Sequence, residues 1–140
     1  MNGSVRQPDI IITTADYDRL FGLAEFAIKD IPNVAAFLME ELERATIAHQ
    51  PPAEPTVRMG SYIYYRDASN EAVRRVRLVY PEDADARRGH ISVLTPVGAA
   101  LIGLSAGQTI EWRDHRGHTK TLTVLAVQDE SDSLNAPLAG

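Results

Sequence analysis

The sequence contains no cysteine, which excludes disulfide bonds, zinc sites built on thiolates and a cysteine nucleophile. It also lacks any apolar run near the roughly 18 residues of a membrane span. Its first residues do not show the charged and then apolar pattern of a secretion signal. We therefore expect a protein that stays in the cytoplasm and does not enter a membrane.

Positive charge is scarce as well. Lysine and arginine together number 14 against 19 aspartates and glutamates, so the formal net charge is -5. Nucleic-acid binding over a whole surface needs a basic footprint, so we expect no sequence-specific DNA binding. The length of 140 residues suits one ordinary domain or two very small ones, and we expect a monomer.

The first part of the chain carries the spacing of two amphipathic helices. The first begins at Thr13 or Thr14, where a threonine can cap a helix. Asn33 is the expected cap of a second helix over residues 34–49, after a break over residues 29–33. The apolar positions of the first helix share one face: Tyr17, Leu20, Phe21 and Ala24.

Two helices of similar length joined by a short break predict an antiparallel hairpin over residues 1–50. Two arrangements stay open: the pair covers one side of a sheet, or it protrudes as a short coiled coil. The apolar stripes are too short for sustained heptads, so a protruding arm is stubby. Helices of about 12 to 16 residues at 1.5 Å per residue reach about 20 Å.

Prolines mark the boundary after the hairpin. Residues 51–56 contain three prolines, which suit neither a helix nor the interior of a sheet and predict a semi-rigid linker. We expect a second domain over residues 57–130, rich in strands, and a loose tail over residues 131–140. Strands with one short helix predict an antiparallel sheet wrapped on that helix, in the α+β class.

The stretch over residues 91–107 has the most distinctive local chemistry. Its first four residues have the apolar character of a short buried strand. Thr95 can cap a helix, and Pro96 then occupies the first helical position, where its missing N–H costs nothing. Gly103 ends a helix of about two turns, which is too short to be stable alone and must pack on a sheet.

The residues of this stretch follow a recognisable order. The sequence reads Ile91-Ser92-Val93-x-Thr95-Pro96-Val97-Gly98-x-Ala100-Leu101-x-Gly103, followed by Ala106-Gly107-Gln108-Thr109-Ile110-Glu111. It resembles the C-terminal domain of the bacterial Gre-type transcription factors, with its pattern I-S-x-x-S/T-P-x-G-x-A-L-x-G. The closer resemblance is to the Rnk branch, named as regulator of nucleoside diphosphate kinase, because of Val79-Tyr80-Pro81 and Gly103-Leu104.

The resemblance implies a fold, a partner and a contact site. The implied fold is FKBP-like from about residue 57 onward, preceded by a helical hairpin. The implied partner is bacterial RNA polymerase, bound at the rim of its secondary channel. The segment around the S/T-P motif contributes to that contact in the family, and it maps to Leu94, Thr95, Pro96 and Val97. The residues alone also permit a simpler interpretation, in which Thr95 and Pro96 only start a helix.

The bend of the hairpin bears on a cleavage function. The resemblance implies a comparison with Gre factors, in which an acidic pair lies at the tip of a long coiled coil. That pair enters the channel and holds a magnesium ion for transcript cleavage. The bend here offers Glu25 and Asp30, with Lys29 between them, and no close acidic pair. We therefore expect no metal site, no cofactor and no cleavage stimulation.

Other residues have both a chemical and a structural interpretation. Ser105 lies in a G-x-S-x-G pattern, but the hydrolase elbow has a strand before the serine and a helix after it, and here the order is reversed. His115 and His118 flank an expected turn without a third metal ligand. The structural interpretation is favoured for all three.

Arginines and tyrosines recur along two expected strands. The arginines can grip phosphate or form a solvated face balanced by nearby acidic residues, and the second interpretation is favoured. Tyr62 and Tyr64 share a face opposite Ile63 and Tyr65, where sheet packing is favoured over a ligand cleft. The arginines are Arg74, Arg75, Arg77, Arg87 and Arg88.

Together these observations predict a non-enzymatic transcription regulator that binds bacterial RNA polymerase near the secondary channel and competes with Gre factors without stimulating cleavage. Two alternatives stay open: a Gre-like elongation factor that stimulates cleavage, and a prolyl isomerase suggested by the FKBP-like fold. An effect on nucleoside diphosphate kinase, implied by the name of the branch, can be direct or can arise through transcription.

Overall fold

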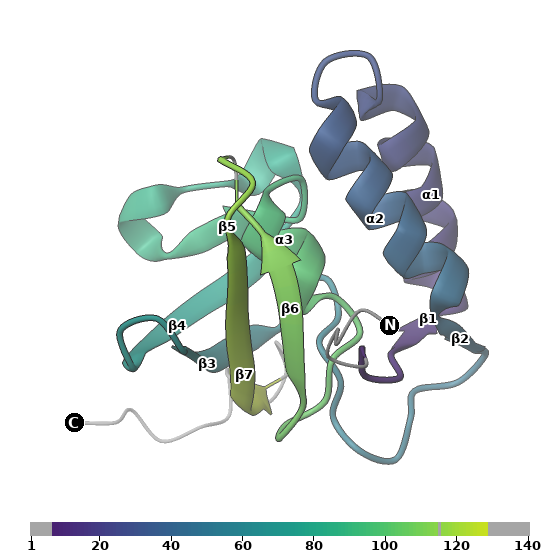
Figure 1. The fold of residues 1–140 in the computed structure, drawn as a ribbon. Coiled ribbons are helices and arrows are strands. Elements are labelled where there is room, and N and C mark those ends of the chain that lie inside the picture. Colours follow the sequence, from purple (N-terminus) through teal and green to yellow (C-terminus); the bar gives the residue numbers. More distant parts are fainter. Residues whose placement is uncertain (1–6, 115, 129–140) are drawn as a thin grey trace, which may run out of the picture.

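The computed structural model describes residues 7–114 and 116–128 (Figure 1). Two helices stand beside a five-stranded sheet that is covered on one face by a short helix. The α+β class is confirmed, whereas the FKBP-like likeness and coiled-coil packing of the helices stay predictions. The elements are β1 (Ile11–Thr13), α1 (Thr14–Ala27), α2 (Pro32–Arg44), β2 (Thr46–Ala48), β3 (Tyr62–Asp67), β4 (Ala72–Val79), β5 (His90–Ser92), α3 (Pro96–Leu101), β6 (Thr109–Arg113) and β7 (Thr119–Gln128).

Helix α1 begins where the sequence predicts. The hydroxyl oxygen of Thr13 accepts a hydrogen bond from the N–H of Asp16 at 3.4 Å, which satisfies one free N–H of the first turn. Leu20 and Ala24 are fully buried, so the predicted apolar stripe is the face that enters the core. Among the described residues, no helix has the length and apolarity required to cross a membrane.

Helix α2 begins earlier than predicted. Asn33 is not its cap, since the helix already starts at Pro32, and Ile31 precedes it without a side-chain cap bond. Proline fits the first helical position because its ring fixes φ and its missing N–H has no intrahelical acceptor there. The position of the proline therefore overrides the capping preference of asparagine.

Helix α2 also ends earlier than predicted, at Arg44 rather than His49. The backbone of Ala45 is extended, and β2 then pairs in parallel with β1, so that Ile47 lies opposite Ile12. β-branched residues suit strands better than helix interiors. This small sheet joins the start of α1 to the end of α2 and closes the base of the hairpin (Figure 1).

The main sheet has the strand order β5-β4-β3-β7-β6. Neighbouring strands are antiparallel except β4 and β5, so the expectation of a purely antiparallel sheet is wrong at this edge. Residues 81–89 form two short 3-10 turns and bring the chain back, so that His90 lies beside Arg77 and β5 runs in the direction of β4. The strand predicted over residues 91–94 is correspondingly short and only half-buried.

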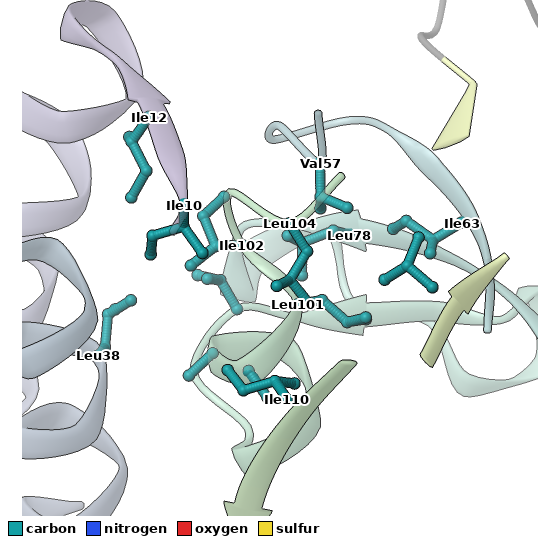
Figure 2. Close-up of a cluster of buried hydrophobic side chains, with 14 of the residues drawn as sticks. Ile10, Ile12, Leu38, Val57, Ile63, Leu78, Leu101, Ile102, Leu104 and Ile110 are labelled. Atoms are coloured by element: carbon teal, nitrogen blue, oxygen red, sulfur yellow. The ribbon is translucent and has the colours of Figure 1, made fainter. Parts of the chain in front are cut away.

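The alternation along the strands separates a buried face from an exposed one. Ile63 of β3, Leu78 of β4 and Ile110 of β6 are completely buried, and they pack with Leu101 of α3 (Figure 2). Tyr65 is buried on the same side as Ile63, whereas the neighbouring tyrosines face outward, as the alternation predicts.

The core continues from the β domain into the hairpin. One cluster of buried side chains includes Leu38 of α2, Ile10 before β1 and Ile102 after α3 (Figure 2). The N–H of Ile11 donates to the carbonyl of Gly103 at 3.1 Å. The hairpin thus covers one side of the β domain at its base, while its loop lies at the opposite end from β1 and β2 (Figure 1). The division of the chain at residues 51–56 stays a prediction.

Candidate functional site

The predicted contact segment, Leu94 to Val97, forms a tight turn into α3. The hydroxyl of Thr95 donates to the carbonyl of Ser92 at 2.7 Å and accepts from the N–H of Gly98 at 3.0 Å. The N–H of Leu94 donates to the Ser92 hydroxyl at 2.9 Å. The predicted cap at Thr95 and the helix start at Pro96 are both confirmed. These bonds hold the segment in one conformation.

Gly98 explains why this turn can be so tight. A side-chain carbon added at this position would lie 2.2 Å from the carbonyl oxygen of Ser92, which is far inside van der Waals contact. The glycine lets the first turn of α3 approach the end of β5. Gly98 is therefore a packing requirement of this turn.

The segment is only partly accessible at the surface. Pro96 is buried. Leu94 and Val97 are half-buried and pack against the core, so the surface of the segment consists of their outer edges and of Thr95. The role of the four residues in a contact with polymerase stays a prediction.

Pro96 lies at a groove between α2 and the edge strand β6, with a volume of about 620 Å³. The walls combine apolar and acidic side chains from two parts of the chain that are distant in sequence. The lining residues of α2 are Asn33, Val34, Ala36, Phe37 and Glu40. Those of β6 and the turn after it are Glu111, Trp112, Arg113, Asp114 and Gly117, and Thr119 at the start of β7 and Gln7 complete the lining.

The edge of β6 is closed by a side chain instead of a strand. The Gln7 amide donates to the carbonyl of Glu111 at 3.1 Å and accepts from the N–H of the same residue at 3.3 Å. The indole nitrogen of Trp112, which also lines the groove, is buried and has no hydrogen-bond partner among the described residues. Sequence reasoning missed this tryptophan, because nothing local indicates that β6 forms an edge facing α2.

The hairpin tip brings Glu25 and Asp30 to the surface. Both side chains are exposed, Glu25 in the last turns of α1 and Asp30 in the loop. Two large apolar side chains lie near them, Phe26 with 80% of its surface exposed and Ile28 with 42%. Within residues 7–114 and 116–128, no group of three or more histidine, aspartate or glutamate side chains is placed to hold a metal ion.

A polar cluster ties α1 to the β domain. A carboxylate oxygen of Asp16 accepts from the N–H of Met59 at 3.1 Å, and burial raises the pKa of Asp16 in spite of that bond. The guanidinium of Arg19 lies 3.6 Å from the ring centre of Tyr80 and 3.1 Å from a carboxylate oxygen of Glu82. Burial raises the pKa of Tyr80 to about 12.

The remaining candidates occupy turns. The N–H of Ser105 donates to the Gln108 side chain at 2.9 Å, and the serine follows a helix and precedes a strand, so the elbow geometry of a hydrolase is absent from this segment. Exposed His118 lies 3.7 Å from half-buried Asp114, and a carboxylate oxygen of Asp114 accepts from the backbone N–H of His118 across the turn. His115 lies outside the described residues.

The arginines separate into two groups. Arg74, Arg75 and Arg77 lie on β4, whereas Arg87 and Arg88 lie in the second 3-10 turn of the loop before β5. Arg88 pairs with Asp85 at 3.6 Å, as expected for a balanced solvated face. The guanidinium groups of Arg75 and Arg77 lie over tyrosine rings of β3, and the Nε of Arg77 also donates to the carbonyl of Gly60 at 3.1 Å.

Comparison with known families agrees with this architecture. A family model described as the C-terminal part of the transcription elongation factors GreA and GreB matches residues 52–129, which include the groove strand β6 and the whole turn into α3. A second model, described as the Rnk N-terminus, matches residues 8–47, which form the hairpin. The chain therefore belongs to the GreA/GreB family and, within it, to the Rnk branch.

Individual relatives have the same organisation. The "Regulator of nucleoside diphosphate kinase" of Escherichia coli (strain K12) is 35% identical over 130 residues, which cover 91% of this chain and 94% of that protein. A structure described as a prokaryotic transcription elongation factor GreA/GreB from Nitrosomonas europaea matches with a TM-score of 0.67 and 35% identity, over 87% of this chain and 99% of that chain. The relatives are thus named as regulators or transcription factors.

GreA itself matches over a shorter length. GreA of Syntrophobacter fumaroxidans is 36% identical over 70 residues, which cover 50% of this chain and 44% of that protein. This chain is therefore similar to that elongation factor over less than half of the factor's length, and to the Escherichia coli regulator over nearly all of it.

Proposed function

We propose that the protein binds bacterial RNA polymerase near its secondary channel and regulates transcription without stimulating transcript cleavage. The observation that carries this proposal is the rigid turn at Leu94 to Val97, set in a domain that matches the GreA/GreB C-terminal model. A segment already held in one conformation loses little entropy on binding, which favours its use as a contact. Binding in the cytoplasm follows from this partner.

The short hairpin supports the second half of the proposal. Its helices have 14 and 13 residues, so at 1.5 Å per residue the arm reaches about 20 Å. A magnesium ion held for catalysis needs converging oxygen ligands. Glu25 lies near the end of α1 and Asp30 in the loop after it, both exposed, and we propose that they do not act as a catalytic pair.

Displacement of a fluorescently labelled Gre factor from core RNA polymerase tests the binding. We expect the natural protein to displace it, and Leu94→Arg to require about tenfold more protein, a loss of about 1.4 kcal/mol. Leu125→Arg is the matched control, because Leu125 is an exposed leucine of β7 outside the segment. Circular dichroism and thermal melting establish that both variants are folded.

Two outcomes of that experiment contradict the proposal. If the natural protein fails to displace the Gre factor at saturating concentration, it does not bind at the secondary channel. If both arginine variants lose affinity equally while remaining folded, the contact does not lie in residues 94–97, and the groove lined by Trp112 and Phe37 becomes the next surface to change.

A cleavage assay tests the absence of catalysis. Backtracked elongation complexes are incubated with magnesium and either this protein or a Gre factor, and the length of the transcript is measured. We expect shortening only with the Gre factor. Shortening by this protein that disappears in Glu25→Gln/Asp30→Asn would establish the alternative, a cleavage-stimulating elongation factor.

The name of the Escherichia coli relative attributes to it the regulation of nucleoside diphosphate kinase. For this chain we propose that any such effect arises through transcription of the kinase gene. Purified kinase should therefore keep its specific activity when an excess of this protein is added. A change in that activity would establish a direct interaction instead.

A further inference from the structure

A second surface lies on the outward face of the sheet, on strands β3 and β4. Tyr62 lies opposite Arg77 in the strand register, and Tyr64 lies opposite Arg75. The Arg75 guanidinium is 4.5 Å from the ring centre of Tyr62 and 5.9 Å from that of Tyr64, and the Arg77 guanidinium is 5.1 Å from that of Tyr62. Two aromatic rings and two guanidinium groups thus form one continuous patch, which we call the Tyr-Arg face.

The position of Arg75 differs from that of an arginine in an ordinary ion-paired strand surface. A guanidinium attracted to the face of an aromatic ring does not use its N–H donors in that contact. The Arg75 side chain is exposed, and no described carboxylate lies within ion-pair distance of it. Arg75 is therefore held in position by aromatic rings and keeps its hydrogen-bonding capacity available.

The face itself is locally basic although the chain is acidic overall. Arg74, next to Arg75 on the same strand, lies opposite Tyr65 and therefore on the other side of the sheet. Arg66 of β3 pairs with Glu71 at 3.8 Å at the far end of the two strands. A local concentration of positive charge attracts a polyanion even where the net charge of the protein is negative.

We propose that the Tyr-Arg face binds single-stranded RNA. A base can stack on the Arg75 guanidinium or on the tyrosine rings, while phosphates accept from the Arg75 N–H groups. Residues two positions apart on a strand are about 6.6 Å apart, so Tyr62 and Tyr64 present stacking surfaces to successive bases of an extended strand. An acidic peptide would satisfy the charge but would leave the stacking surfaces unused.

A polar side chain beside the face favours RNA over DNA. Gln128 of β7 lies opposite Tyr62 in the register and therefore on the same face of the sheet. Its amide supplies both a donor and an acceptor, which suits a 2′-hydroxyl that acts in both ways. The Tyr-Arg face lies on β3 and β4, whereas the groove lies at the edge strand β6, which β7 separates from β3.

The test is fluorescence anisotropy of a labelled oligouridylate of twelve nucleotides with the full chain at low salt, without polymerase. We expect Arg75→Ala to weaken binding about tenfold and Arg75→Lys to restore only part of it, because lysine keeps the charge but not the planar stack. Arg116→Ala is the matched control, since this exposed arginine lies in the β6–β7 turn, at the opposite end of β7 from Gln128. It should change affinity less than twofold.

Four outcomes would overturn the proposal. The first is the absence of binding up to about 100 μM, the weak limit of non-specific association. The second is an equal loss in Arg75→Ala and Arg116→Ala, which indicates general electrostatics. The third is equal affinity for oligodeoxythymidylate, which removes the role of the 2′-hydroxyl. The fourth is equal affinity for a polyglutamate peptide, which makes the face an acidic-protein contact. None of these outcomes depends on polymerase binding.

Discussion

The base and the tip of the helical hairpin are built in opposite ways. At the base, Leu42 is 1% exposed, and Glu41, although charged, is 3% exposed and paired with Arg44 at 2.8 Å. A guanidinium N–H of Arg44 also donates to the carbonyl of Pro8. At the tip, Phe26 and Ile28 leave large apolar surfaces in water. The same two helices therefore pass from core to solvent along their length.

The difference indicates which end is constrained by folding and which end is available for recognition. Side chains at the base contribute to stability through burial and hydrogen bonds, so their chemistry is limited by packing. An exposed phenylalanine gains nothing from folding, since its surface stays hydrated. The tip can therefore change its sequence with little effect on the fold, and changes at the base test how firmly the hairpin is held.

The largest effect is expected for Leu42→Ala. Removal of a fully buried leucine side chain at the base loses burial and leaves a cavity, and should lower the free energy of unfolding by about 3 kcal/mol. Urea denaturation followed by circular dichroism measures this change. A loss below about 1 kcal/mol would contradict the view that the base is part of the core.

Glu41→Gln is expected to have the next largest effect. The substitution removes the charge that faces the Arg44 guanidinium, whose Nε and Nη2 lie 3.0 and 2.8 Å from the carboxylate oxygens. We expect the free energy of unfolding to fall by about 2 kcal/mol, since a partly buried cation loses its partner. The double variant Glu41→Met/Arg44→Met is the control and should recover most of the stability, because no charge is then left unpaired.

Asp16→Asn should change the stability by a smaller amount, and at neutral pH it should raise the stability instead of lowering it. The folded-state pKa of Asp16 is raised by burial, so its contribution to stability is fully present below the ordinary value of 3.8 and is lost as pH rises through the folded-state pKa. Asparagine keeps an oxygen for the Met59 N–H without the charge. We expect a modest rise in melting temperature at pH 7, and no rise at pH 3. A fall at pH 7 would show that the charge stabilises the fold.

The smallest effect is expected for Phe26→Ala at the tip. Its side chain is 80% exposed, so the free energy of unfolding should stay within about 0.5 kcal/mol of that of the natural protein. The same urea experiment as for Leu42→Ala gives the contrast directly. A loss of more than 1 kcal/mol would mean that the tip is folded against something, and would remove the distinction between the two ends.

The parts of the fold that depend on local chemistry could be predicted from the sequence. Thr13 and Thr95 cap helices in the predicted way, and Gly103 ends α3 with a φ of 82° that suits glycine. The alternation in β3 and β4 likewise separates inward from outward residues over a few positions. In each case the neighbours that decide the conformation are close in sequence.

The parts that depend on distant partners could not be predicted in this way. The sequence predicts helix where β2 forms, because its partner β1 is separated from it in sequence by both helices of the hairpin. The direction of β5 follows from the path of the loop before it, and no residue of β5 encodes that path. The groove brings Phe37 and Trp112 to one place only because α2 packs on α3 and α3 packs on β6.

The small parallel sheet of β1 and β2 has a consequence for how the length of the helical hairpin can evolve. It fastens both ends of the hairpin at one place, and the bond from Ile11 to Gly103 fixes that place on the β domain. Whole helical turns can then be added to or removed from α1 and α2 in matched amounts without disturbing the attachment. Natural variation or protein engineering can therefore change the length of the hairpin while its attachment to the β domain stays the same.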